Sequence, residues 1–162
     1  MRIAVPIIAL VVGCSPVTAP VSSPDHPLVK SFIAAQSLTP NWNKNIYPSV
    51  HNWDQTIELG NGLTFQILAY ESVGGRFEGK YSDERAIRTI AVPGDYIYPC
   101  DIRVDLAKKH LFCKASGLAG GIYHETVIFE YDLLGRKVVD KIRVDPKLLP
   151  ANPKPVTPAP NP

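Results

Sequence analysis

Polar and apolar residues alternate along much of the chain, and the clearest alternation surrounds the dipeptide Asn61-Gly62. Apolar residues stand at every second position on both sides of it, in the runs 57–59 and 63–69. A period of two places these side chains on one face of a strand. Asn-Gly between two such runs is a strong hairpin signal, because both residues tolerate the positive φ angles of a tight turn. The pattern therefore predicts a β-hairpin with one apolar face.

Further short runs of the same kind follow downstream, each ending at a Gly, Pro, Asp or Lys that favours a turn. They are RFEGKYS, AIRTIAV, CDIRVDL, KHLFCKA, ETVIFEYDL and KVVDKIRV. Their spacing predicts a mostly β fold, namely a small antiparallel domain of about seven or eight strands. A meander, a sandwich and a partial barrel all fit this pattern.

Two other segments precede the first hairpin. Leu28, Phe32 and Ala35 stand at near-helical spacing, which predicts one short N-terminal helix within residues 28–37. Residues 40–54 mix Asn, Pro and aromatic residues without a regular period. We interpret them as an ordered loop packed by its aromatic side chains.

The two ends of the chain differ in composition from this domain. Residues 15–27 and 150–162 are dominated by Pro, Ser, Thr, Ala and Asn and show no apolar periodicity. Such segments cannot bury a core and stay extended as semi-rigid spacers. We therefore expect a tether at 14–27, a single β-rich domain at 28–149 and a disordered tail at 150–162. A solvated tail is the favoured interpretation, and a docking strand for a partner is the alternative.

An apolar stretch precedes the tether. It begins after Arg2 and has only about ten apolar residues, whereas a helix needs about twenty to span a bilayer. A short apolar segment behind a positive charge is typical of a secretory signal peptide. The segment ends in VVGC, residues 11–14, which resembles the lipobox of bacterial lipoproteins. The resemblance covers residues 1–14 only.

The lipoprotein resemblance implies that residues 1–13 are removed, that the Cys14 thiol carries a diacylglyceryl group and that the new amino terminus is acylated. Two or three acyl chains anchor a protein effectively permanently, since each buried methylene contributes about 0.8 kcal/mol. Ser15 stands where Asp would retain an enteric lipoprotein, so the resemblance implies an outer-membrane anchor facing the periplasm. The alternative is an ordinary secreted protein with a chance cysteine near its cleavage site.

Lipidation of Cys14 leaves Cys100 and Cys113 as a pair. They lie on either side of a predicted hairpin, and an oxidising periplasm favours a disulfide between them. Closing a loop of about a dozen residues would stabilise the fold by about 3 kcal/mol. Two buried thiols are the alternative. A metal site is not expected, since neither cysteine has a second ligand at CxxC or CxxH spacing.

Charge and motif content narrow the function. The formal net charge is only +2, so the chain does not have the strongly basic character of a nucleic-acid-binding protein. The four histidines form no HxH, HExxH or HxxxH pair, and neither a GxSxG elbow nor a P-loop occurs. We therefore expect no catalytic site, no metal and no cofactor.

Two classes of function remain. The favoured class is a non-catalytic envelope lipoprotein that binds another protein in the periplasm, as a component of an envelope machine or in an inhibitor or immunity pair. The alternative is a small enzyme acting on peptidoglycan or another envelope glycan. A carboxylate pair leaves little trace in a sequence, and Asp83-Glu84 or Asp101 and Asp105 could meet other carboxylates in the fold.

Partner contacts are expected on loops held by a rigid scaffold. The aromatic loop 42–53 and the Gly-rich loop 116–124 are the segments least needed for a core. Trp and Tyr provide large contact areas with few rotatable bonds, so the hypothetical contacts are Trp42, Tyr47, Trp53 and Tyr123. The alternative is that these rings cap the end of the sheet and belong to the core.

Overall fold

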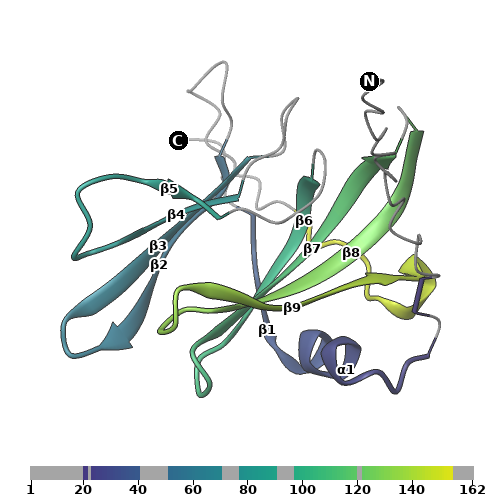
Figure 1. The fold of residues 1–162 in the computed structure, drawn as a ribbon, viewed down its shortest axis with the longest axis horizontal. Coiled ribbons are helices and arrows are strands. Elements are labelled where there is room, and N and C mark those ends of the chain that lie inside the picture. The colour runs from purple at the N-terminus through teal and green to yellow at the C-terminus, as the bar shows by residue number, and fades with distance from the viewer. Residues whose placement is uncertain are drawn as a thin grey trace, which may run out of the picture.

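Two antiparallel sheets and one short α-helix make up the domain (Figure 1). The computed structural model describes residues 20–21, 23–40, 51–70, 77–90, 97–119 and 122–154. The helix is α1 (Pro27–Ala34), and a 3-10 turn, η1 (Pro146–Leu148), follows the last strand. The strands are β1 (Gln36–Leu38), β2 (His51–Gly60), β3 (Leu63–Tyr70), β4 (Phe77–Tyr81), β5 (Arg88–Thr89), β6 (Ile97–Asp105), β7 (His110–Ala119), β8 (Ile122–Asp132) and β9 (Lys137–Val144).

The strands confirm the mostly β prediction, with nine strands in the described residues. One sheet has five strands in the order β1-β6-β7-β8-β9, and the other has four in the order β2-β3-β4-β5. Because the two sheets share one core and do not close into a barrel, the arrangement is a sandwich. Helix α1 confirms the short helix expected near Leu28.

The hairpin predicted at Asn61-Gly62 joins β2 to β3. Asn61 has φ 52° and Gly62 has φ 75°, as a type I′ turn requires. The predicted apolar face is also present, since Ile57 pairs with Phe65 in register and both side chains are buried. Local turn chemistry and alternation therefore determined this element.

Two similar turns connect strands of the larger sheet. In the β6–β7 turn, Asp105 Oδ1 accepts hydrogen bonds from the backbone N–H of Ala107 and of Lys108, both at 3.1 Å. In the β8–β9 turn, Asp132 Oδ1 accepts from Leu134 and Gly135 in the same way. Each turn ends in a residue with positive φ, which is Lys109 in the first and Arg136 in the second. The second turn therefore fixes the position of Arg136, the residue just before β9.

Two buried clusters hold the domain together. The larger lies between the sheets and includes Phe65, Phe77 and Phe129, and the last two rings meet edge to face at 5.7 Å. The smaller lies on the other face of the five-stranded sheet, where Phe32 of α1 packs with Phe112 and other apolar side chains. Helix α1 therefore covers the outside of the larger sheet (Figure 1).

Both ends of the described chain contact this sheet. Val21 forms a parallel bridge with Val144 at the edge of β9, since its N–H donates to the Arg143 carbonyl at 2.8 Å and its carbonyl accepts from Asp145 at 3.0 Å. Lys114 Nζ donates to the Pro150 carbonyl at 2.9 Å. Part of the expected tether and the start of the expected tail thus contact the domain.

Two predicted loops differ from the structure. Strand β2 begins at His51, so the last residues of the predicted aromatic loop belong to a strand. Residues 41–50 lie outside the described residues. The Gly-rich segment 116–124 is largely strand, because β7 extends to Ala119 and β8 begins at Ile122. Gly117 lies within β7 and does not have the positive φ of a turn glycine. No helix among the described residues is long and apolar enough to cross a membrane.

Candidate functional site

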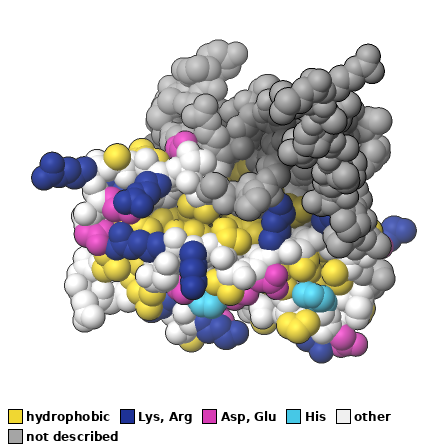
Figure 2. Space-filling view, in the orientation of Figure 1, with side chains coloured by type: hydrophobic (Ala, Val, Ile, Leu, Met, Phe, Trp, Pro, Cys, Tyr) yellow, Lys and Arg dark blue, Asp and Glu magenta, His cyan; other side chains and the backbone are white. Residues whose placement is uncertain are grey.

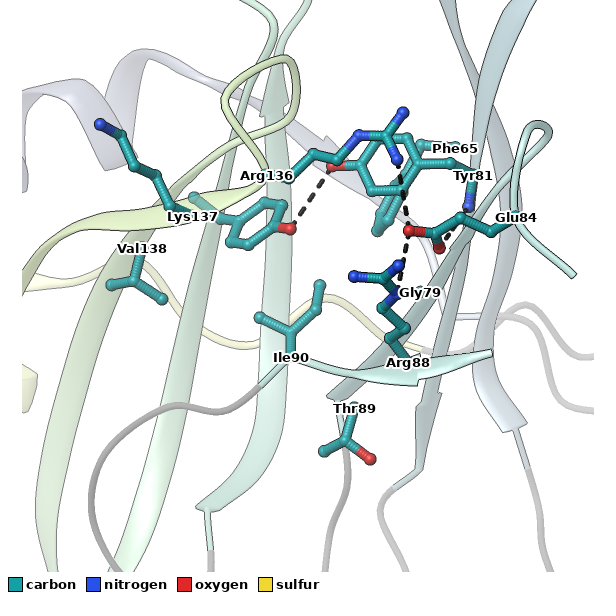
Figure 3. A pocket seen from close by; sticks show the side chains of 11 residues that line it. Phe65, Gly79, Tyr81, Glu84, Arg88, Thr89, Ile90, Arg136, Lys137 and Val138 are labelled. Atoms are coloured by element: carbon teal, nitrogen blue, oxygen red, sulfur yellow. Dashed lines mark hydrogen bonds and ion pairs between the residues drawn. The ribbon is translucent and has the colours of Figure 1, made fainter. Parts of the chain in front are cut away.

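A cavity of about 290 Å³ opens between the four-stranded sheet and the start of β9. Its apolar floor comes from both sheets, and charged side chains stand at its rim (Figure 3). We call this cavity the inter-sheet pocket. Its lining residues are Phe65, Gly79, Tyr81, Glu84, Arg88, Thr89, Ile90, Tyr131, Arg136, Lys137 and Val138.

Three aromatic rings form part of the floor. The Phe65 ring lies 4.8 Å from that of Tyr81 and 6.3 Å from that of Tyr131, measured between centroids. Phe65 also lies over Gly79 on the neighbouring strand, where a Cβ would come within 2.1 Å of its Cζ atom. Glycine at position 79 is therefore needed for this ring arrangement.

The Tyr81 hydroxyl connects the two sheets. It donates to the Leu133 carbonyl at 2.7 Å, and its oxygen lies 3.4 Å from the Tyr131 hydroxyl. Burial, helped by the neighbouring Tyr131 hydroxyl, raises the pKa of Tyr81 well above its usual 10.0. Tyr81 is consequently a neutral phenol across the physiological range.

A cluster of ion pairs stands at the rim. Glu84 Oε1 accepts from Arg88 Nε at 3.0 Å and from Arg136 Nη1 at 3.3 Å. Arg136 also donates from Nη2 to Asp83 at 2.6 Å, and its guanidinium lies 4.1 Å above the Tyr81 ring. The hydrogen bond from Arg136 lowers the pKa of Asp83, and the same bond raises the pKa of Arg136.

The chain segments that meet here are distant in sequence. Asp83 and Glu84 follow β4 in a turn closed by the Glu84 N–H, which donates to the Tyr81 carbonyl at 2.9 Å. Arg88 begins β5, and Arg136 is placed by its positive φ at the end of the β8–β9 turn. In Figure 3, Arg88 and Arg136 approach Glu84 from opposite sides.

The surface around the pocket combines apolar and cationic groups. Figure 2 shows a band of hydrophobic side chains across the described surface, bordered by Lys and Arg side chains. Of the pocket's own cations, Arg88 is 72% exposed, and Lys137 is exposed at the start of β9. An aromatic floor next to exposed cations is suited to binding a group that is partly apolar and partly negative.

The predicted contact residues lie elsewhere. Trp53 is only 1% exposed, and its indole N–H donates to the Leu38 carbonyl at 3.1 Å. The expectation that Trp53 contacts a partner is therefore wrong, because the ring fills the core between the sheets. Tyr123 lies in β8, paired with Leu118, and its side chain is outside the described residues. Trp42 and Tyr47 fall outside them altogether.

The two downstream cysteines lie on adjacent strands, as expected. Cys113 is buried in the inter-sheet core, and Cys100 lies at an irregularity of β6. Both sulfurs approach the Lys114 carbonyl, at 3.3 Å for Cys100 and 3.7 Å for Cys113. They are not bonded to each other in the structure, so the disulfide stays a prediction. Cys14 lies outside the described residues.

Within the described part of the chain, no three His, Cys, Asp or Glu side chains gather in a way that could hold a metal ion. Comparison of the chain with protein-family models, with curated proteins and with solved structures gave no match. The function therefore has to be argued from the geometry of the site.

Sequence reasoning missed the inter-sheet pocket. Three of its four charged lining residues, Glu84, Arg136 and Lys137, stand in the short segments SDER (82–85) and LGRK (134–137), which look like ordinary solvated turns. The fourth, Arg88, follows the first segment by three residues. The only available signal was the adjacent pair Asp83 and Glu84, which was considered as part of a carboxylate pair. The structure places a guanidinium group beside both of them instead.

Proposed function

We propose that this chain is a lipid-anchored, non-catalytic binding protein of the bacterial cell envelope, and that its β domain binds another protein through the inter-sheet pocket. The anchor rests on the lipobox resemblance at Cys14. The binding site rests on the pocket geometry, and the observation that carries it is the exposed cationic rim over an aromatic floor.

The rigidity of the site supports binding. Tyr81 and Leu133 join the sheets by a hydrogen bond, and Glu84 fixes two arginine side chains in place. Because these groups are held before a partner arrives, little side-chain freedom is lost on association. A rigid, preorganised pocket of this kind favours specific recognition.

The carboxylates in and beside the pocket, Glu84 and Asp83, do not favour the enzyme alternative. A glycoside hydrolase needs one carboxylic acid with a raised pKa and a second carboxylate across the bond to be cleaved. Here Arg136 lies between Asp83 and Glu84, and it lowers the pKa of Asp83. The arrangement therefore orients cations at the rim and does not favour proton donation.

Site-specific photo-crosslinking in the source bacterium tests this function. A photoreactive amino acid replaces Lys137 at the pocket rim, and a matched control replaces Thr56, which is exposed on β2 outside the pocket. We expect a discrete protein adduct from position 137 that is absent from position 56. The captured protein, once identified by mass spectrometry and purified, should bind the purified chain and bind the Arg88→Gln variant more weakly.

Two outcomes contradict the proposal. One is the same set of adducts from both positions, which would indicate random collision. The other is release of soluble fragments from purified peptidoglycan by the purified chain, which would establish the enzyme alternative.

A further inference from the structure

The hydrogen-bonding groups of the inter-sheet pocket are mostly donors. Tyr81 has a single hydroxyl proton, and the short 2.7 Å bond to the Leu133 carbonyl uses it. The Tyr131 hydroxyl is 3.4 Å away from that of Tyr81, so its own proton is held by a long, weak bond at most. Tyr131 therefore retains a donor that a ligand can use.

The one carboxylate among the lining residues is already satisfied. Glu84 Oε1 is paired with Arg88 and Arg136, and Oε2 accepts from the Tyr81 N–H at 3.4 Å. The Glu84 side chain is only 7% exposed. Glu84 thus fixes the guanidinium groups and presents little negative charge to an incoming ligand.

Arg88 supplies the most accessible donors of the pocket. Its Nε is bound to Glu84, and the four terminal N–H groups extend beyond that bond with no acceptor among the described residues. These terminal groups form a planar fork that matches a carboxylate in a bidentate geometry. Lys137 adds a second exposed cation on the β9 side.

The size and floor of the pocket limit what can accompany the negative group. Small-molecule pockets usually measure about 300–1,000 Å³, so a volume of about 290 Å³ fits one side chain or a group of similar size. Val138, which is partly exposed, offers with Tyr131 and Ile90 an apolar surface on which such a group packs. A flat or apolar group with an adjacent carboxylate satisfies both parts of the pocket.

We propose that the inter-sheet pocket recognises an acidic segment of its partner protein, in which an Asp or Glu carboxylate pairs with Arg88 and a neighbouring aromatic side chain packs on the floor. This inference rests on the proposed function, since it names the chemistry of the partner at the same site. Charge complementarity carries it: the pocket offers Arg88 and the Tyr131 hydroxyl as donors, Lys137 adds positive charge on the β9 side, and Glu84 is already engaged.

Titration with two blocked dipeptides tests the inference. The probe is N-acetyl-Phe-Asp-amide, and the isosteric control is N-acetyl-Phe-Asn-amide, which lacks the charge. Binding to the ¹⁵N-labelled full chain is followed by NMR through the backbone amides of Gly79 and Ile90, both in the pocket. We expect the Asp peptide to bind about tenfold more tightly than the Asn peptide, as a charge-assisted hydrogen bond implies.

A pair of arginine variants separates this site from general electrostatics. Arg88→Gln should remove the preference for Asp. Arg85→Gln removes the same charge from an exposed position three residues away that does not line the pocket, and it should keep the preference. Equal binding of both peptides, or equal loss in both variants, would overturn the inference.

Two further outcomes are decisive. If D-glucuronate shifts the same amides with an equal dependence on Arg88, the pocket recognises a sugar carboxylate and the acidic-peptide assignment is wrong. If neither peptide binds while crosslinking from position 137 still captures a partner that requires the pocket, this inference fails and the proposed function stands. Peptide binding without any captured protein would instead count against the proposed function.

Discussion

Phe65 lies directly over Gly79, one strand away, so closely that a Cβ at position 79 would come within 2.1 Å of the Phe65 ring. The ring cannot move aside easily, because Tyr81 and Tyr131 flank it at 4.8 and 6.3 Å. This contact fixes the floor of the inter-sheet pocket. The constraint at position 79 is therefore steric and does not come from the backbone, since Gly79 has no positive φ.

Gly79→Ala is therefore expected to lower the free energy of unfolding by about 1–3 kcal/mol, the usual cost of overpacking a core. Gly117→Ala is the matched control in β7, where the nearest atoms to an added Cβ lie 3.9 Å away. That variant should keep the stability of the wild type or gain up to about 1 kcal/mol. Urea denaturation measures both. Equal stability of the two variants would show that Phe65 repacks without cost.

Tyr81→Phe should lower the free energy of unfolding by about 1–2 kcal/mol at neutral pH, because the Leu133 carbonyl loses its 2.7 Å hydrogen bond. Tyr131→Phe should cost less, since Tyr131 has only the longer 3.4 Å contact with Tyr81. The order of the two effects in urea denaturation checks this assignment. A larger loss for Tyr131→Phe contradicts it.

The Tyr81 hydroxyl also predicts a pH dependence. Its pKa is raised in the folded chain above the usual 10.0, so its stabilising contribution is complete below pH 10 and is lost as the pH rises above that value. The difference in unfolding free energy between wild type and Tyr81→Phe should therefore narrow from pH 7 to pH 11. A constant difference over this range would mean that Tyr81 ionises as easily in the folded chain as in the unfolded one.

Trp53→Ala should destabilise the domain by about 3–5 kcal/mol, because it empties a fully buried site and removes the hydrogen bond to the Leu38 carbonyl. Thr56→Ala, at an exposed position of the same strand, is the control and should change stability by less than about 0.5 kcal/mol. Thermal unfolding distinguishes the two. A melting temperature unchanged in Trp53→Ala would restore the binding role first expected for this ring.

Mass spectrometry of the non-reduced protein from an oxidising compartment should show Cys100 linked to Cys113. The two residues lie on adjacent strands, and both sulfurs contact the Lys114 carbonyl, at 3.3 Å for Cys100 and 3.7 Å for Cys113. Burial raises the pKa of the Cys113 thiol, so Cys100 is favoured as the sulfur that first attacks a disulfide oxidant of that compartment and forms a mixed disulfide. Cys113 then displaces the oxidant's thiol and closes the bridge. Alkylation of both thiols in material from that compartment contradicts this prediction.

Cys14→Ser should move the protein from the membrane fraction to the soluble periplasm or leave its leader uncleaved. The physical reason is the loss of the acyl chains, whose many buried methylenes supply the membrane affinity. Fractionation and labelling with a radioactive or clickable fatty acid measure the effect. Wild-type protein without any acyl label would remove the basis for an envelope location.

The sequence predicted those features that depend on neighbouring residues. The β2–β3 hairpin followed from Asn61-Gly62, because turn type and strand alternation are both local. The extended strands at 116–124 did not follow, since glycines there resembled a loop and only pairing between β7 and β8 shows that they form a ladder.

The inter-sheet pocket could not be predicted for a related reason. Tyr81 and Leu133 are 52 positions apart, and Glu84 and Arg136 are equally distant. Their approach depends on how two sheets pack and on the register of each strand, neither of which alternation determines. The role of Trp53 was mispredicted for the same reason: the sequence around it has no regular period, so it did not show that Trp53 lies in β2 with its ring toward the core.

The bridge between Val21 and Val144 has a consequence for how far the domain reaches from a membrane. If Cys14 carries lipid, the segment from Cys14 to Val21 is the linker between the membrane and the domain, and its fully extended length is at most about 25 Å. From there β9 runs about 20 Å to Val138 at the pocket, since each strand residue advances about 3.3 Å. The pocket would then stay within a short distance of the lipid surface. Proteins held close to that surface would meet the pocket at a high effective concentration, whereas those free in the surrounding volume would meet it rarely.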